Sequence, residues 1–297
     1  MNRAADARGF TRMKTLHVDC GREMAGGQWQ VLYLVERLKD AVLMAPESSP
    51  LLAEARKRGL DARALSLVAL WKAARKADLV HAHDSRAHTL AAVAGGAPLV
   101  VSRRVGFPMK PGFFSGQKYA AARMYLAVSK YVAARLHERG MKWRRIRVVY
   151  DGVPIPERAS SLTGGAVAIV KSDPDAISRA GVPVHFVSDL WQDLSTARVC
   201  VYWSEMEGLG SGALAAMASG VPVIASRVGG LAEAIEDERT GLLVDGPDQL
   251  AAALRRLTEN PREAEEMGRH ARETALAKFS VEAMVQATLR AYQEVFE

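Results

Sequence analysis

Short apolar runs rich in Val, Leu and Ile alternate along the chain with longer alanine-rich segments of helical period, and this alternation constrains the fold more than any other feature. A strand followed by a helix and a further strand is typical of a parallel sheet covered by helices. The clearest helical segment is 28–39, where Val31, Leu34, Val35 and Leu38 share one face. The sequence therefore predicts an α/β protein built from doubly wound parallel sheets.

The apolar runs mark the expected strands. In the first half of the chain they lie near residues 16–19, 41–44, 62–65, 79–81, 99–101, 125–128 and 146–149. In the second half they lie near residues 167–170, 184–187, 199–202, 221–225 and 242–244, and the chain from Pro261 onward is expected to be helical.

Two halves of opposite charge meet at a stretch of turn-forming residues. Residues 1–150 carry 27 Lys and Arg against 11 Asp and Glu, whereas the remainder carries 13 against 22. Turn formers and two prolines between Asp151 and Pro156 predict a domain boundary there. We therefore expect a disordered arm over 1–12, an N-terminal domain over 13–156 and a C-terminal domain over 157–297 with a helical tail.

Composition narrows the protein class. With 49% hydrophobic and 25% charged residues, the chain is typical of globular proteins rather than of disordered ones. No apolar run approaches the roughly 18 to 20 residues that a membrane-spanning helix needs. The two cysteines, Cys20 and Cys200, lie far apart without a disulfide-framework spacing, which indicates a reducing compartment. These features predict a cytoplasmic protein.

Basic residues concentrate between Arg103 and Arg147, where twelve Lys and Arg meet a single acid, Glu138. Such a surface favours an anionic partner, either phosphates or lipid headgroups, so we expect an anionic membrane surface at the inner face of the membrane as a further partner. The alternative is that these residues form solvated helix faces that only keep the protein in solution.

Ligands of open parallel sheets bind beyond the carboxyl ends of the strands, so the residues that follow each strand are the candidate site residues. Gly26 and Gly27 precede a helix and would let a phosphate approach its free amides. His81 and His83 lie on one side of the next relevant strand, where a histidine could bind a sugar hydroxyl or move a proton. A metal site at these histidines and a purely structural role, with Asp84 as a helix cap, are the alternatives.

Basic side chains follow the next strand. Arg103 and Arg104 stand at its end, and Lys110 and Lys118 lie in or just after a loop over 107–116. Together with Arg86 they are candidate residues for binding a phosphorylated or lipid-linked acceptor.

Glycines and an acid follow a strand of the second half. Glu207 can accept hydrogen bonds from two sugar hydroxyls, and Gly208, Leu209, Gly210 and Ser211 lead into a helix whose first amides suit a diphosphate. Gly229 and Gly230 follow the next strand, and taken alone they are only a glycine turn.

These segments together resemble the family 4 retaining glycosyltransferases. The resemblance rests on the segments Glu207-Gly-Leu-Gly, Ala216-Met-Ala-Ser-Gly-Val-Pro-Val-Ile-Ala-Ser, Val228-Gly-Gly and Thr240-Gly-Leu-Leu-Val, and in the first half on Gly26-Gly27, Val80-His-Ala-His-Asp-Ser-Arg-Ala-His, Ser102-Arg-Arg, Ala127-Val-Ser-Lys and Val149-Tyr-Asp-Gly-Val. It implies the GT-B architecture, in which two Rossmann-like domains face each other across a cleft, here with an abridged second domain.

The resemblance also implies roles. His83 would be the active-site histidine near the reacting sugar, and Glu207 would bind the donor sugar. Gly26, Gly27 and the 208–211 segment would line the donor phosphates, with Lys171 as the nearby basic candidate. The partners implied are a nucleotide-diphosphate sugar and a glycan or lipid-linked acceptor, with no nucleic acid, metal ion or other cofactor.

Ala215 departs from the family pattern, because it occupies the position of a second glutamate that usually holds the nucleotide ribose. The alternative function is therefore a catalytically weakened nucleotide- or sugar-binding homologue that acts as a partner subunit.

Overall fold

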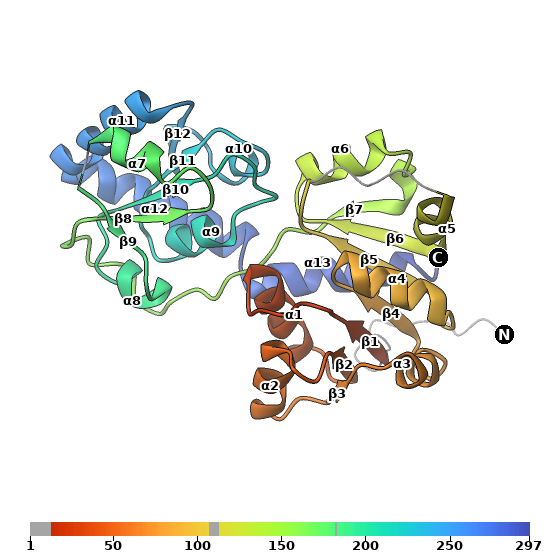
Figure 1. Ribbon diagram of the computed structural model, residues 1–297. Coiled ribbons are helices and arrows are strands. Elements are labelled where there is room, and N and C mark those ends of the chain that lie inside the picture. Colours follow the sequence, from red (N-terminus) through yellow and green to blue (C-terminus); the bar gives the residue numbers. More distant parts are fainter. Residues whose placement is uncertain (1–12, 107–112, 182) are drawn as a thin grey trace. The chain divides into compact units, whose positions relative to one another are not determined.

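The computed structural model describes residues 13–106, 113–181 and 183–297, which form two compact units (Figure 1). Unit 1 holds the chain up to Val128 together with Ala133–Val149 and Met284–Glu297, and unit 2 holds Ser129–Val132 and Tyr150–Ala283. The expected arm over 1–12 lies outside the described residues. Each unit is built around one parallel sheet, as the alternating pattern predicts.

Unit 1 contains a seven-stranded sheet in the order β3-β2-β1-β4-β5-β6-β7, with every pairing parallel. The strands are β1 Thr15–Val18, β2 Ala41–Ala45, β3 Ala62–Ala64, β4 Leu79–Ala82, β5 Leu99–Arg103, β6 Ala122–Ala127 and β7 Ile146–Val148. β1 and β4 are buried at every position, because helices cover both faces of such a sheet.

The first half of the chain forms the helices α1 Gly26–Glu36, α2 Pro50–Lys57, α3 Leu67–Ala74, α4 Ser85–Ala94, α5 Phe113–Ala121 and α6 Lys130–Glu138, followed by a 3₁₀ turn, η2 Trp143–Arg145. Local sequence explains where α3 and α4 begin. Ser66 accepts a hydrogen bond from the Ala69 amide at α3, and Asp84 accepts from two amides at α4. Val31, Leu32 and Val35 of α1 pack with Leu43 of β2 and Leu51 of α2 in the core.

Unit 2 contains a five-stranded parallel sheet in the order β12-β11-β10-β8-β9. Its strands are β8 Ala166–Val170, β9 His185–Phe186, β10 Val199–Trp203, β11 Val223–Ser226 and β12 Gly241–Val244. Its helices are α7 Asp175–Ala180, α8 Leu190–Leu194, α9 Ser211–Ala218, α10 Leu231–Ala234, α11 Pro247–Glu259 and α12 Pro261–Lys278, and α13 Val281–Glu294 begins in this unit. All twelve expected strands are thus confirmed.

The division into units differs from the expected domains in three places. The units divide at Val149/Tyr150 rather than after Pro156, and the last fourteen residues belong to unit 1 rather than to the C-terminal domain. Residues Ser129–Val132 also belong to unit 2 rather than to the N-terminal domain. Tyr292 of α13 explains the second difference, since its fully buried hydroxyl forms a hydrogen bond with His81 of β4. A contact across 211 residues leaves no trace in local sequence.

In both sheets the strand order reverses at one point, and ligands of such folds bind at this reversal. In unit 1 it lies between β1 and β4, and in unit 2 between β8 and β10. The residues that follow these four strands include His83, the segment before Gly26, Lys171 and Glu207. Among the described residues, no helix is both long and apolar enough to cross a membrane.

Candidate functional site

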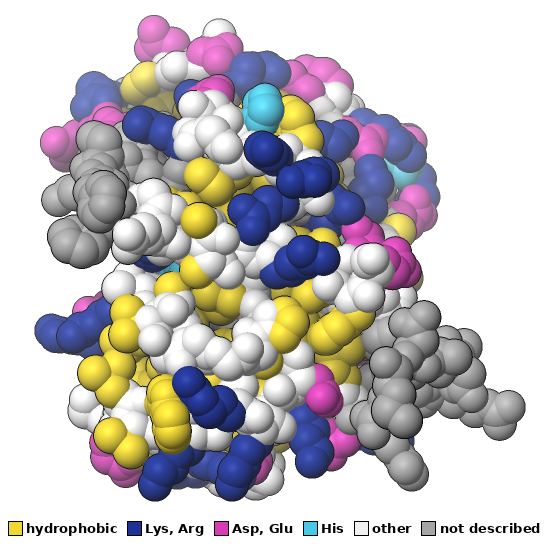
Figure 2. All heavy atoms as spheres, turned by 90° about the vertical axis from the view of Figure 1, so that its right-hand side faces the viewer, with side chains coloured by type: hydrophobic (Ala, Val, Ile, Leu, Met, Phe, Trp, Pro, Cys, Tyr) yellow, Lys and Arg dark blue, Asp and Glu magenta, His cyan; other side chains and the backbone are white. Residues whose placement is uncertain are grey.

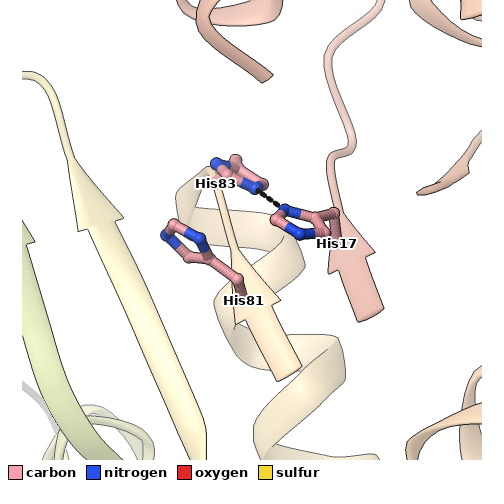
Figure 3. Close-up of side chains that lie close together, drawn as sticks. All are labelled: His17, His81 and His83. Carbon is pink, nitrogen blue, oxygen red and sulfur yellow. Dashed lines mark hydrogen bonds between the residues drawn. The ribbon is translucent and has the colours of Figure 1, made fainter. Parts of the chain in front are cut away.

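In unit 1 the candidate residue His83 directly follows β4, and its amide donates to the Val18 carbonyl at the end of β1. Its ring lies beside those of two further histidines, His17 of β1 and His81 of β4 (Figure 3). The three side chains share one side of the sheet because residues two apart on a strand point the same way, and His17 pairs with His81 in register. All three are buried.

Hydrogen bonds connect this histidine cluster (His17, His81 and His83) to hydroxyl groups. His17 Nδ1 lies 3.0 Å from His83 Nε2, and His17 Nε2 lies 3.0 Å from Thr15 Oγ1. The two ring nitrogens of His81 lie 2.6 Å from the Tyr292 hydroxyl and 2.8 Å from Ser102 Oγ. Within this cluster, His83 Nδ1 is the nitrogen to which the described residues give no hydrogen-bond partner.

Burial keeps the cluster uncharged. Removal from water lowers the pKa of His17 from 6.5 to about 3 and lowers the pKa values of His81 and His83 well below 6.5. His17 lowers the pKa values of His81 and His83 further, His81 lowers that of His83, and the positive charge of Arg104 lowers both. The three rings are therefore neutral at physiological pH, and each carries one proton.

The histidine cluster is also the place in the described chain where a metal ion could be held, since one nitrogen from each ring lies within 4.8 Å of the others. Two observations favour the hydrogen-bonded arrangement instead. Five of the six ring nitrogens already have partners, and the charge of Arg104 opposes a further cation. We interpret the cluster as a hydrogen-bonded support for His83.

Gly26 and Gly27 form the amino end of α1, as expected. The loop before them is held by Asp19, a buried residue at the end of β1 whose carboxylate accepts from the Gly21 amide and from the Gln28 side chain. A Cβ on Gly27 would lie 3.7 Å from the Arg104 side chain, and Arg104 itself donates to the His83 carbonyl. The structure thus brings Gly27, Arg104 and His83 together.

The remaining basic candidates of unit 1 are more scattered. Arg86 is exposed on the first turn of α4, and Lys118 Nζ donates to the Ser85 carbonyl at 2.6 Å. The Arg103 side chain has a buried Nε without a partner in the described chain. Lys110 lies outside the described residues, and α5 occupies the end of the expected loop.

The structural alternative holds for Asp84 and His88. Asp84 accepts from the Arg86 and Ala87 amides, and it also accepts from the Cys20 amide at 2.5 Å. His88 Nε2 lies 2.9 Å from the Lys118 carbonyl, and burial lowers the pKa of His88 to about 4. Both residues hold α4 in place.

In unit 2 the candidate Glu207 lies in the loop after β10, and two hydrogen bonds fix its carboxylate. Tyr202 donates its hydroxyl to Oε2 at 2.6 Å, and the Gly208 amide donates to Oε1 at 3.0 Å. Burial and the neighbouring Glu207 charge raise the pKa of Tyr202, so this hydroxyl remains a donor. The free lone pairs of the carboxylate can still accept hydrogen bonds from a ligand.

Gly229 and Gly230 support this loop from beneath, a role that the sequence alone did not reveal. A Cβ on Gly229 would lie 2.1 Å from the Glu207 carbonyl oxygen, and one on Gly230 would lie 1.9 Å from the Gly208 carbonyl oxygen. The Gly230 amide donates to the Glu207 carbonyl at 3.0 Å. Only residues without a side chain let the two backbones approach so closely.

Leu209 and Gly210 lead from Glu207 into α9, which begins at Ser211. Gly210 has a φ of 93°, a backbone conformation that favours glycine, and no side chain caps the first amides of α9. Ala215 is buried inside α9, and its methyl side chain provides no carboxylate at this position. Lys171 is exposed directly after β8, and its amide donates to the Trp203 carbonyl.

Sequence reasoning missed the partners of the two candidate residues. His17 and Tyr202 lie on strands, at positions where an apolar residue would fit the alternation of apolar runs equally well. Tyr292 is separated from its partner His81 by 211 residues. The only sign in the sequence that His17 has a hydrogen-bond partner was a polar ring within an apolar run that is expected to be a buried strand. The pairings themselves depend on tertiary structure.

Comparison with known proteins gives the family. The model for glycosyltransferase family 4 matches residues 22–156, and the model for glycosyl transferases group 1 matches residues 183–274. The D-inositol 3-phosphate glycosyltransferase of Corynebacterium diphtheriae is 31% identical over 216 residues, covering 64% of this chain and 47% of that protein. The enzyme of the same name from Paenarthrobacter aurescens is 44% identical over 101 residues, which is 33% of this chain and 24% of the relative. The chain therefore spans less than half the length of these curated relatives.

Among solved structures, the complex of Anabaena HepE with UDP superposes with a TM-score of 0.82 at 16% identity, covering 95% of this chain and all of that one. This likeness confirms the GT-B type of fold, with a Rossmann-like sheet in each unit. The two family models match in the expected order, the first on the N-terminal half and the second on the C-terminal half. The chain belongs to the family 4 and group 1 class of GT-B glycosyltransferases.

Proposed function

We propose that the chain is a retaining glycosyltransferase that moves a sugar from a nucleotide-diphosphate sugar to a cell-envelope or lipid-linked acceptor without a metal ion. The observation that carries the proposal is the loop at Glu207, where a carboxylate fixed by two hydrogen bonds immediately precedes the uncapped amino end of α9. Two further findings support the proposal. The chain matches the glycosyltransferase family models, and the structurally similar HepE was crystallised in complex with UDP and with UDP-glucose.

In this proposal Glu207 accepts hydrogen bonds from hydroxyls of the donor sugar, and the first amides of α9, with Ser211, receive the diphosphate. As the sugar leaves, charge develops on the diphosphate, and amides and basic side chains that already point at it stabilise that charge. For unit 1 the proposal keeps the roles that the family resemblance implies, in which Gly26 and Gly27 line the donor phosphates and His83 lies near the reacting sugar.

Donor binding tests the proposal directly. Thermal unfolding of the purified chain is measured with UDP, GDP, ADP and CMP, alone and as common nucleotide sugars, with UDP first. A ligand at a hundred times its Kd adds about 2.7 kcal/mol, which raises the unfolding midpoint by several degrees. A midpoint that moves with none of these nucleotides contradicts the donor class.

Measurement of turnover distinguishes an active transferase from a catalytically weakened nucleotide- or sugar-binding homologue, the alternative that Ala215 also fits. Transfer of radiolabelled sugar to membrane extracts is expected in the wild type and lost in His83→Ala, with nucleotide affinity nearly unchanged in that variant. Nucleotide binding without transfer to any fraction supports the weakened homologue.

We expect activity to be independent of metal ions. Dialysis against EDTA leaves the transfer rate unchanged in this proposal, because amides and guanidinium groups offset the diphosphate charge. A rate that falls with EDTA and recovers with Mg²⁺, Mn²⁺ or Zn²⁺ contradicts it.

The proposed acceptor implies contact with an anionic membrane, for which unit 1 offers a basic surface. Exposed cations surround η2 at the end of the sheet, and Trp143 within it is 51% exposed and stacks on the His137 ring. The cations are Arg123, Arg139, Lys142 and Arg144. Figure 2 looks onto the side of unit 1 where β6, β7 and the C-terminus lie, and Lys and Arg side chains gather in the upper part of this face.

Sedimentation with vesicles tests this surface. Binding to phosphatidylglycerol vesicles is expected to fall as salt rises and to fall further in the double variant Lys142→Glu, Arg144→Glu. The matched control reverses two exposed arginines of unit 2, Arg255→Glu and Arg262→Glu, and is expected to bind like the wild type. Equal losses in both double variants would show that only net charge matters and would remove the η2 surface from the proposal.

A further inference from the structure

Thr15, His17 and His83 form a continuous hydrogen-bonded chain that runs from β1 to the end of β4. The Thr15 hydroxyl pairs with one nitrogen of His17, and the other nitrogen of His17 pairs with Nε2 of His83, each at 3.0 Å. Figure 3 shows the remaining nitrogen of His83 on the side of its ring away from His17. That nitrogen, Nδ1, is buried and has no partner in the described chain.

The protons of this chain are coupled, because each neutral ring has one nitrogen that donates and one that accepts. If His17 Nδ1 donates to His83, its Nε2 must accept from Thr15, and the His83 proton then resides on Nδ1. If His83 Nε2 donates instead, His17 Nε2 must donate to Thr15, and His83 Nδ1 is a bare acceptor. The direction of one hydrogen bond thus decides what His83 offers to a ligand.

Thr15 settles the direction. Its hydroxyl is buried, and His17 is the partner that the described residues give it. A buried hydroxyl that only accepts would leave its own proton unsatisfied, which destabilises the folded protein. The hydroxyl therefore donates to His17 Nε2, His17 Nδ1 donates to His83 Nε2, and the proton of His83 lies on Nδ1.

We propose that His17, oriented by Thr15, is a positioning residue that holds His83 as the Nδ1–H tautomer, so that His83 donates a hydrogen bond to an oxygen atom of the ligand. The identity of the ligand, an oxygen-rich sugar or phosphate, rests on the proposed function. The tautomer of His83 does not, because it follows from the hydrogen bonds of Thr15, His17 and His83. It assigns His83 the role of a donor rather than that of a base. A ligand oxygen would also relieve the buried N–H of His83, which lacks a partner in the described structure.

The tautomer can be read without any activity. In protein labelled with ¹⁵N-histidine, long-range ¹H–¹⁵N correlation distinguishes the protonated nitrogen of each ring, and the signals of His83 are those lost in His83→Gln. The wild type is expected to show His83 protonated at Nδ1. Protonation at Nε2 in the wild type overturns the proposal.

Substitutions at both supporting residues sharpen the test. Thr15→Val keeps the shape of the side chain but removes the hydroxyl, and it is expected to move His83 toward the Nε2–H form. Thr288→Val, which removes another buried hydroxyl, whose partner among the described residues is the Met284 carbonyl, is the matched control and leaves the His83 signals unchanged. A Thr15→Val spectrum identical to the wild type also overturns the proposal.

His17 offers a second pair of variants. The amide of Asn reaches about as far as Nδ1 and can still donate to His83, so His17→Asn is expected to retain the Nδ1–H form. The amide of Gln reaches toward the Nε2 position facing Thr15, so in His17→Gln we expect His83 to lose the Nδ1–H form. If transfer activity is found, the rate should fall at least tenfold in His17→Gln and recover in His17→Asn. Absence of donor binding in the wild type would refute the proposed function while leaving the spectra to decide the tautomer.

Discussion

At the scale of single residues, hydrogen bonds hold the two central candidate side chains, Glu207 and His83, in place. Tyr202 and the Gly208 amide fix Glu207, and His17 fixes His83. Such fixation lowers the entropy lost when a ligand binds, because the side chain is already ordered. Changes to the candidates should therefore alter ligand affinity more than stability.

We expect Glu207→Gln to weaken donor binding roughly ten- to a hundredfold, because a charged acceptor of hydrogen bonds contributes about 1.5 to 3 kcal/mol. The fold should persist, since the amide oxygen of Gln can still accept from Tyr202. Isothermal titration with the nucleotide sugar measures the effect. Glu205→Gln, two residues earlier and exposed, is the control and should bind normally. Equal affinity of both variants would contradict the role of Glu207.

At the scale of elements, the loop after β10 depends on the loop after β11. The glycines at 229 and 230 press their backbones against residues 207 and 208, so the position of the Glu207 carboxylate is set by a turn more than twenty residues away. Sequence reasoning found both motifs and used both for the family resemblance, but taken alone the second was only a glycine turn, and it was given no role in supporting the first. The sequence shows that Gly229 and Gly230 lack side chains, but it cannot show that the backbone of residues 207 and 208 occupies the position of the missing Cβ atoms.

Gly230→Ala should displace this loop. A methyl group 1.9 Å from the Gly208 carbonyl oxygen cannot be accommodated without movement of the backbone, and overpacking of this kind costs about 1 to 3 kcal/mol. The thermal midpoint and the affinity for the nucleotide sugar should fall together. Gly165→Ala faces open space and is the control, with both quantities expected near wild type. A Gly230→Ala variant with normal affinity would show that the loop does not need this support.

The sequence predicted the strands well, because parallel strands buried on both faces are continuous apolar runs whose position needs no tertiary information. It predicted the position of the candidate residues for the same reason, since His83 directly follows one such run and Glu207 lies in the loop after another. It could not predict the partners. Tyr292 contacts His81 across 211 residues, and the assignment of the last helix to unit 1 follows from that contact.

At the scale of the whole molecule, unit 1 contains four buried histidines whose pKa values are lowered by burial, namely His17, His81, His83 and His88. In the unfolded chain these groups take up protons near their ordinary pKa of 6.5, whereas in the folded protein they do not. The unfolded state therefore binds more protons below that pH, and stability falls as pH falls.

We expect the free energy of unfolding to decrease between pH 6.5 and about 4, by about 1.4 kcal/mol per pH unit for each histidine that stays neutral. Urea unfolding at several pH values measures the slope. His17→Asn removes one such group and should make the slope shallower. Identical slopes in the wild type and His17→Asn would contradict the burial of a neutral ring at position 17.

The return of residues 284–297 to unit 1 has a consequence for how the chain folds during its synthesis. Tyr292 and Val295 are buried in that unit, so its core remains incomplete until these residues have left the ribosome. Unit 2 needs no residue beyond Ala283 and can complete its sheet earlier. The half that is translated first is thus the half that finishes folding last, and until then His81 waits without one of its two hydrogen-bond partners.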